Sequence, residues 1–400
     1  MRTVLVIFLA AGLAAAPPVV KDPSKTGLDP ARLARIPERL RQFVDSGKAA
    51  GFVTLVARNG QIAALDATGY TDMETREPMK ADNIFQIHSM TKPIVCAGVM
   101  MLAEEGRLSL TDPIEKHLPE FRGLMVRTES GALRQPVRPV LIRDLMTHTS
   151  GMILNPPAGI GELHGALHKP LSEVILVASQ QPLSFDPGTR WQYSNMGIAA
   201  LARVIEVHSG MAFEKFLEGR IFKPLGMVDS YIFPPREKFH RMPTAYVLRD
   251  GKTVKYTTDP LGEGKMKFRE GARYSLPEGG IYSTATDLFA FYQLMLNKGT
   301  YNGVRLLSPA SVELMTANHT GDLRTSQLGA GWGLGWYVIT GPAGQLSSAS
   351  LGTFGHGGRY GTYCLIDPGK KLIGIFLIHR EGGSDERLAF SSLAYSAVTE

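Results

Sequence analysis

Apolar residues gather in short runs near both ends of the chain, whereas longer helical patterns fill its middle. One pair of strand-like runs is joined by Asn59-Gly60, a dipeptide typical of tight β-hairpins. The strand-like runs cover residues 52–58, 61–68, 361–366 and 372–378. The helical patterns cover residues 89–105, 171–179, 196–209 and 212–221. The sequence therefore predicts an α/β chain of the α+β type, with a sheet built from both ends of the chain around a helical region.

The same patterns predict a domain organisation. We expect residues 30–88 to join residues 275–400 in a sheet domain, with residues 89–274 forming a mainly helical domain. Within the latter, an excursion over residues 232–278 is rich in proline, glycine and charge. It is either a solvated excursion or a wall of a substrate pocket, because long loops often carry function.

Residues 1–16 begin with a charged residue, Arg2, and continue as an apolar run that ends in small residues. This pattern is typical of a secretory signal peptide and is too short to span a bilayer. We therefore expect a periplasmic or secreted protein without a stable membrane span after the signal is removed, and a cytoplasmic location is the alternative.

Ser89 and Lys92 stand three residues apart at the start of a predicted helix, so their side chains share one helix face. A serine hydroxyl becomes a good nucleophile when a neighbouring base takes its proton. A lysine can be that base once burial or nearby positive charge has lowered its pKa. The helix N-terminus also favours negative charge at Ser89, although a serine there can equally be a simple helix cap.

Two further segments carry polar groups suited to such a site. Tyr193 and Asn195 precede the helix predicted over residues 196–209, and in an extended loop they point the same way. They can offer a phenol and an amide to one site, or serve as an aromatic anchor and a cap. His356-Gly357-Gly358 precedes a β-rich run, where glycines let the backbone approach a ligand closely or simply form a turn.

Two other features are interpreted as structural. His148-Thr149-Ser150-Gly151 follows a helical run over residues 142–146 and is typical of a turn rather than of a second active site. Cys96 falls in a predicted helix and Cys364 in a predicted strand, which favours two buried thiols over a disulfide.

Three motifs of this chain, residues 89–92, 193–195 and 356–358, resemble in this order the catalytic motifs of the serine β-lactamase and penicillin-binding-protein superfamily. The resemblance is to the class C-like branch that contains D-alanyl-D-alanine peptidases and family VIII carboxylesterases. It implies an antiparallel sheet flanked by helices, with the active-site cleft at the junction with an all-helical region. It also implies that Ser89 is acylated, that Lys92 and Tyr193 share the base and acid work, and that Asn195 orients Lys92 and the substrate.

The third motif departs from the β-lactamase pattern. His356 and Gly357 replace a lysine and a threonine that help to hold a substrate carboxylate, and a neutral imidazole and a bare backbone hold one less well. Gly358 completes the motif. The resemblance implies that the backbone amides of Ser89 and Arg359 form the oxyanion hole, and the Arg359 side chain could restore a cation.

These departures favour a serine carboxylesterase that acts on ester bonds first, and on amide bonds second, through a covalent acyl-enzyme. A β-lactamase or a D-alanyl-D-alanine carboxypeptidase is the alternative within this chemistry. A non-catalytic penicillin-sensing module is the alternative from a different class.

The composition of the chain indicates no further class of binding partner. The net charge of +6 comes from scattered lysines and arginines, which does not favour a nucleic-acid surface. His, Cys and acidic residues show no metal-ligand spacing, so neither a metal nor another cofactor is expected. The expected partner is a small-molecule ester or amide, and nothing in the sequence indicates an oligomeric state.

Overall fold

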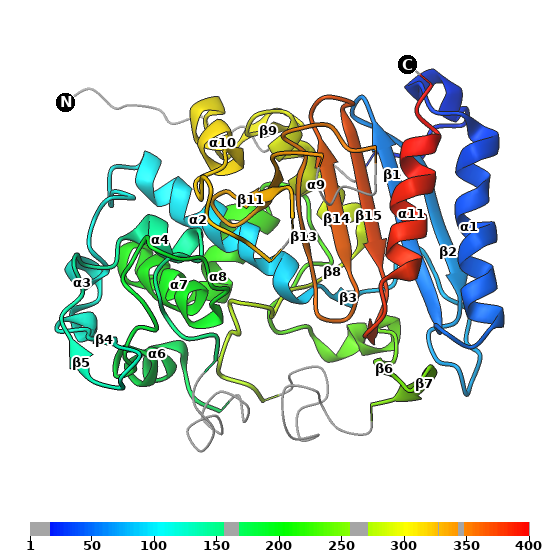
Figure 1. Cartoon of the computed structure of the whole chain (residues 1–400). Helices are drawn as coiled ribbons and strands as arrows, with labels where there is room; N and C mark the ends of the chain where they lie inside the picture. Colours follow the sequence, from blue (N-terminus) through cyan, green and yellow to red (C-terminus); the bar gives the residue numbers. More distant parts are fainter. Residues whose placement is uncertain (1–16, 156–167, 257–270, 327, 343–347, 400) are drawn as a thin grey trace, which may run out of the picture.

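The computed structural model describes residues 17–155, 168–256, 271–326, 328–342 and 348–399 (Figure 1). Its centre is a seven-stranded antiparallel sheet with the strand order β11-β12-β13-β14-β15-β1-β2. Strands β1 (Gly51–Arg58) and β15 (Leu372–Leu377) lie side by side in it. The other strands of the sheet are β2 (Gln61–Gly69), β11 (Ala330–Trp332), β12 (Tyr337–Ile339), β13 (Phe354–Gly357) and β14 (Tyr363–Asp367). The predicted α+β class, with a sheet formed by both ends of the chain, is confirmed.

The β1–β2 hairpin forms where the sequence predicts it. Asn59 has a φ of 53° and Gly60 a φ of 79°, so both central turn residues are left-handed. This is the backbone of the type I′ turn, whose twist matches that of the flanking strands. The Asn-Gly pair therefore fixes the register of the hairpin.

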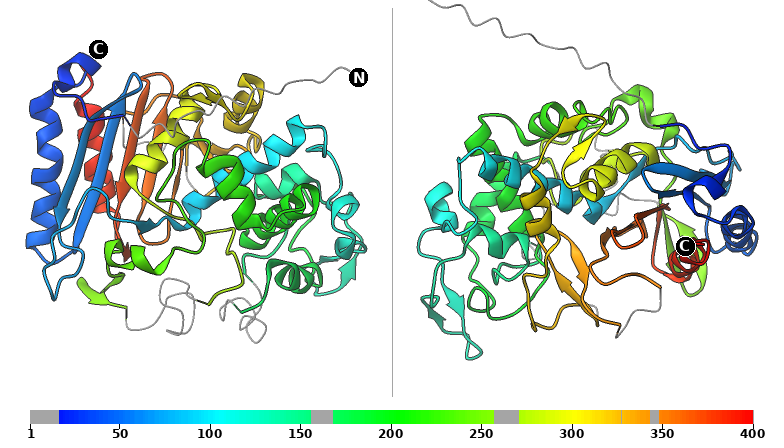
Figure 2. Two further views of the ribbon diagram at one scale, coloured as in Figure 1. Left: turned by 180° about the vertical axis from the view of Figure 1, so that it is seen from behind. Right: turned by 90° about the horizontal axis from the view of Figure 1, so that it is seen from above.

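Helices cover both faces of the sheet (Figures 1 and 2). Helices α1 (Pro30–Asp45) and α11 (Asp385–Ser396) lie together on one face, and α9 (Ala285–Leu296) packs on the other. Side chains alternate along β15, so Phe376 belongs to the core beneath α1 and α11, whereas Ile375 and Leu377 belong to the larger core on the opposite face.

The helical region packs around two apolar helices, α2 (Lys92–Glu104) and α7 (Asn195–Ser209). Every residue of α2 from position 92 to 102 is buried, which explains why this helix is apolar on all sides. The shorter helices packed on α7 are α4 (Ile142–Met146), α6 (Leu171–Ser179) and α8 (Phe213–Leu217). The helix predicted over residues 212–221 is interrupted, because a π-helical turn, η4 (Glu218–Phe222), follows α8.

Smaller elements complete the described part of the chain. The other helices are η1 (Pro23–Thr26), η2 (His88–Thr91), α3 (Ile114–His117), η3 (Pro119–Phe121), η5 (Arg236–Arg241) and α10 (Pro309–Thr316). Short strands pair as β3 (Phe85–Gln86) with β8 (Tyr282–Ser283), β4 (Val126–Arg127) with β5 (Leu133–Arg134), and β9 (Thr300–Tyr301) with β10 (Val304–Arg305). A three-stranded sheet contains β6 (Tyr246–Arg249), β7 (Lys252–Lys255) and β16 (Arg380–Glu381).

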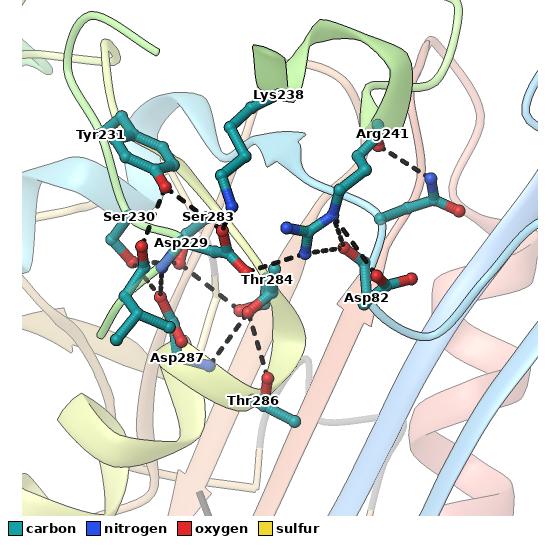
Figure 3. A network of polar contacts seen from close by, with 12 residues as sticks. Asp82, Asp229, Ser230, Tyr231, Lys238, Arg241, Ser283, Thr284, Thr286 and Asp287 are labelled. Atoms are coloured by element: carbon teal, nitrogen blue, oxygen red, sulfur yellow. Dashed lines mark hydrogen bonds and ion pairs between the residues drawn. The ribbon is translucent and has the colours of Figure 1, made fainter. Parts of the chain in front are cut away.

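A network of polar contacts fixes the segment after η4 beside β8 and the start of α9 (Figure 3). The Asp287 carboxylate accepts hydrogen bonds of 2.8 Å from the Asp229 backbone N–H and from the Ser230 hydroxyl. Asp229 is paired at 2.8 Å with Arg241, which also lies 3.4 Å from the Asp82 carboxylate. The network therefore supports β8, whose partner β3 leads directly to the Ser89 turn.

The excursion and the N-terminal segment are described only in part. Residues 1–16, the predicted signal peptide, lie outside the described residues, as do residues 257–270 of the excursion. Residues 232–256 contain η5 and the β6–β7 hairpin, which pairs with β16 and so is attached to the body of the protein. Within the described residues, no single helix is both long and apolar enough to cross a bilayer.

Both cysteines are buried free thiols, as predicted.

Candidate active site

Ser89 lies on the one-turn 3-10 helix η2, which leads into α2. The predicted α-helical start at Ser89 is wrong, because the α-helix begins only at Lys92. His88 has a φ of 47°, a left-handed conformation that prevents an α-helix from extending upstream. Its ring packs edge-on against Tyr360, with 4.1 Å between the centroids. This backbone turn leaves Ser89 half-buried in an otherwise buried segment.

The Lys92 side chain is fully buried and reaches back to Ser89. Its Nζ lies 2.9 Å from Ser89 Oγ and donates a 2.6 Å hydrogen bond to the backbone carbonyl of Glu278. Burial lowers the pKa of Lys92 to about 7, although the Glu278 carboxylate acts in the opposite direction. A lysine with this pKa is largely unprotonated in mildly alkaline solution, so it can accept a proton from Ser89.

Tyr193, which is distant in the sequence, joins Ser89 and Lys92 in one cluster. It lies two residues before α7, where the Ser194 hydroxyl caps the helix by accepting a 2.9 Å hydrogen bond from Gly197 N–H. Burial raises the pKa of the Tyr193 phenol above its usual value, while a hydrogen bond with Ser89 lowers it. Lys92 Nζ lies 4.8 Å from the centroid of the Tyr193 ring. The phenol is therefore neutral and remains able to donate a proton.

Glu278 is a site residue that the sequence reasoning missed. It lies on a tight turn in which the N–H groups of Gly279 and Gly280 both donate to the Leu276 carbonyl, over 2.9 and 2.6 Å. Its carboxylate accepts a 3.0 Å hydrogen bond from the Tyr274 hydroxyl. Because the contact with Lys92 is made by a backbone carbonyl, the identity of the side chain at this position gives no sign of it.

His356 lies on β13, at the edge of the same site. Its Nδ1 donates a 2.7 Å hydrogen bond to the Gly357 carbonyl, and its Nε2 has no partner among the described residues. Burial, reinforced by the charge of Lys92, lowers the pKa of His356 to about 3, so the imidazole is neutral. Gly358 docks this strand end on the Ser89 turn, because a Cβ there would lie only 2.4 Å from the Ile87 carbonyl oxygen.

Two predicted binding residues have other partners. Arg359 forms an ion pair with Glu381, with 3.1 Å between Nε and Oε2, so its charge is already neutralised. Asn195 Nδ2 donates a 2.8 Å hydrogen bond to Asn155, and the group that holds Lys92 is the Glu278 carbonyl instead.

A cavity of about 270 Å³ borders β13, and it lies between β11–β14 and α11. His356, Gly357 and Arg387 are among its lining residues. A Cβ at Gly357 would lie 3.6 Å from the Arg387 guanidinium, which also lies 5.1 Å from the centroid of the Tyr363 ring. Arg387, on α11, is thus a cation beside His356 and Gly357 that the sequence analysis did not identify. No group of three or more His, Cys, Asp or Glu residues in the described ranges is arranged to hold a metal ion.

Comparison with known proteins shows which family the chain belongs to. The family model described as Beta-lactamase matches residues 36–395. Protein Rv1367c of Mycobacterium tuberculosis is 32% identical over 359 residues, which cover 85% of this chain and 88% of that protein. Esterase EstB of Burkholderia gladioli is 30% identical over 374 residues, which cover 86% of this chain and 90% of that protein.

A solved structure, that of EstCE1, described as a hydrolase with promiscuous acyltransferase activity, superposes with a TM-score of 0.77. The match covers 92% of this chain and 99% of the EstCE1 chain at 23% identity, and it shows a shared fold.

Proposed function

Because this chain belongs to the Beta-lactamase family of serine hydrolases, we propose that it is a carboxylesterase that forms a covalent acyl-enzyme on Ser89. One observation carries the assignment of the nucleophile. Lys92 Nζ lies 2.9 Å from Ser89 Oγ in a fully buried position that lowers the pKa of the lysine to about 7. This geometry provides a serine with a base that is unprotonated near neutral pH.

Acylation follows from these positions. Neutral Lys92 takes the Ser89 proton while Oγ attacks the ester carbonyl carbon, and the amides of Ser89 and Arg359 stabilise the oxyanion by about 3 kcal/mol each. Tyr193 donates its proton to the leaving alkoxide oxygen as the ester C–O bond breaks, and the proton on Lys92 is returned to Tyr193. The products are the acyl-enzyme and a free alcohol.

Deacylation reverses the roles, with water in place of the alcohol. Lys92 and Tyr193 together remove a proton from water as its oxygen attacks the acyl carbonyl. The bond between Ser89 Oγ and the acyl carbon then breaks, Oγ is reprotonated, and a carboxylic acid is released.

The third motif supports an ester in preference to a β-lactam. His356 is neutral, Gly357 has no hydroxyl, and Arg359 is paired with Glu381, so these three residues offer little to a substrate carboxylate.

A β-lactamase or D-alanyl-D-alanine carboxypeptidase activity is the second candidate, favoured by Arg387. Its guanidinium lies beside Gly357 on the wall of the cavity, where it can meet an anionic group of a substrate.

A side-by-side assay tests this ranking. The wild-type protein is given p-nitrophenyl butyrate, a chromogenic cephalosporin and a D-alanyl-D-alanine peptide, with Ser89→Ala as the background control. We expect the ester to be hydrolysed with the highest kcat/KM. Comparable turnover of the cephalosporin or the peptide, abolished by Arg387→Ala, would instead support the second candidate.

The apolar pattern over residues 1–16 further supports a periplasmic or secreted location. N-terminal sequencing of the protein recovered from a secreting host tests this proposal, since an N-terminus that retains residues 1–16 contradicts it.

A further inference from the structure

His148 holds the backbone on both sides of Tyr193. Gln192 N–H donates a 2.9 Å hydrogen bond to the His148 carbonyl oxygen. Ser194 N–H donates to the Nδ1 atom of the same histidine, over 3.2 Å. The residues on either side of Tyr193 are therefore both hydrogen-bonded to His148, which is distant in the sequence. The backbone at Tyr193 consequently has little freedom to shift.

The ring of His148 also packs on the ring of Tyr193. Their centroids are 4.3 Å apart with 36° between the planes, and His148 is fully buried. Trp332 closes the group, with its ring centroid 5.1 Å from that of His148 and 5.9 Å from that of Tyr193. Packed between these rings, the phenol can adopt few side-chain orientations.

The turn that carries His148 is shaped for these contacts. His148 follows the C-cap of α4 with a φ of 60°, a strained conformation for a residue other than glycine. Because Nδ1 accepts a hydrogen bond, the proton of the neutral imidazole lies on Nε2. Burial, with Lys92 nearby, lowers the pKa of His148 well below its usual value and keeps the ring in this acceptor form.

We propose that His148 is a positioning residue that fixes the Tyr193 hydroxyl at the distance from Ser89 and the leaving group that proton transfer requires. The proposal rests on the proposed role of Tyr193 as proton donor. The turn interpreted as purely structural from the sequence thus acts in the reaction through another residue.

A double-mutant cycle tests the proposal, with the acylation rate of p-nitrophenyl butyrate measured by stopped flow. His148→Ala should lower kcat for acylation about tenfold or more with little change in KM, because small misplacements of a catalytic group are costly. In a Tyr193→Phe background the same change should cost less than about twofold, since no hydroxyl remains to be placed. His148→Asn, whose amide oxygen can accept from Ser194 N–H and which tolerates a positive φ, should recover part of the rate.

Controls separate this role from general destabilisation. His117→Asn alters another buried histidine, which bonds to Asp112 and His208 away from the site, and should acylate at the wild-type rate. If His148→Ala does not fold, as judged by thermal melting, His148→Gly carries the cycle, because glycine adopts the positive φ of this position and lacks both the ring and the acceptor. A penalty of equal size in both backgrounds, or none in either, would overturn the proposal.

A wild-type protein that hydrolyses no ester would instead overturn the proposed function. The same cycle would then be measured on the β-lactam or peptide that acylates Ser89.

Discussion

Replacing Lys92 with methionine keeps most of the side-chain volume but removes the buried amine. In the folded protein burial lowers the pKa of this lysine from 10.5 to about 7, because the charged form loses its hydration. A shift of this size corresponds to about 5 kcal/mol of preference for the neutral amine. The wild-type protein therefore carries an electrostatic cost at neutral pH that the methionine variant lacks.

The sign of the pH effect follows from proton counting. Above about pH 7 the folded protein has released the Lys92 proton, whereas the unfolded chain keeps it until about pH 10.5. Since the unfolded state binds more protons in this window, the free energy of unfolding of the wild type rises with pH. Between about pH 7.5 and pH 9.5 it should gain about 2.5 kcal/mol relative to Lys92→Met.

The assay is urea unfolding followed by circular dichroism, at several pH values across that window. Subtracting the free energy of unfolding of Lys92→Met from that of the wild type at each pH cancels the titration of the groups that the two proteins share, including both cysteines. In parallel, the wild-type acylation rate should rise with pH, be half-maximal near pH 7 and reach a plateau in mildly alkaline solution, where Lys92 is neutral. Unfolding free energies that change in parallel with pH in the two proteins would refute the reasoning, because the lysine would then not be a buried, neutral base.

Three further perturbations test other parts of the account. Glu278→Gln removes a carboxylate that raises the pKa of Lys92, so the rising limb of the acylation rate should move to lower pH, and an unmoved limb contradicts this electrostatic coupling. His356→Lys combined with Gly357→Thr should raise the rate of cephalosporin acylation relative to p-nitrophenyl butyrate hydrolysis, since a carboxylate contact contributes about 1.5–3 kcal/mol. An unchanged ratio of the two rates argues against the third motif as the cause of weak carboxylate recognition. Asp287→Asn removes a carboxyl group whose pKa burial raises to about 6. Between about pH 4 and pH 6 the folded wild type keeps a proton on Asp287 that the unfolded chain releases, so the melting temperature of the wild type should fall with pH relative to that of the variant. Melting curves that shift in parallel over this range exclude that contribution.

Local patterns in the sequence predict the elements that carry the site. The helix predicted over residues 171–179 matches the observed α6 residue for residue. Asn59-Gly60 specifies one hairpin, because both residues tolerate the left-handed backbone that its turn requires. The spacing of Ser89 and Lys92 predicts the contact between their side chains, because residues three apart on one helical turn meet.

Contacts made by the backbone or between distant residues are not predictable in this way. The Glu278 carbonyl reaches Lys92 across 186 residues, and no side-chain pattern records it. The pairing of Arg359 with Glu381 depends on where β16 lies, which neither segment specifies alone. His148 looks like a turn residue because it is one, and its contacts with the Tyr193 loop become visible only once the two segments are packed together.

The most direct test of the central claim is to identify the residue that becomes acylated. The wild-type protein is treated with a fluorophosphonate and digested, and the modified peptide is located by mass spectrometry. We predict a single adduct, on the half-buried Ser89. This adduct should be absent from Ser89→Ala and should form far more slowly in Lys92→Ala. An adduct on Ser150 or Ser194, both of which are buried, or undiminished labelling of Ser89→Ala, would contradict the account.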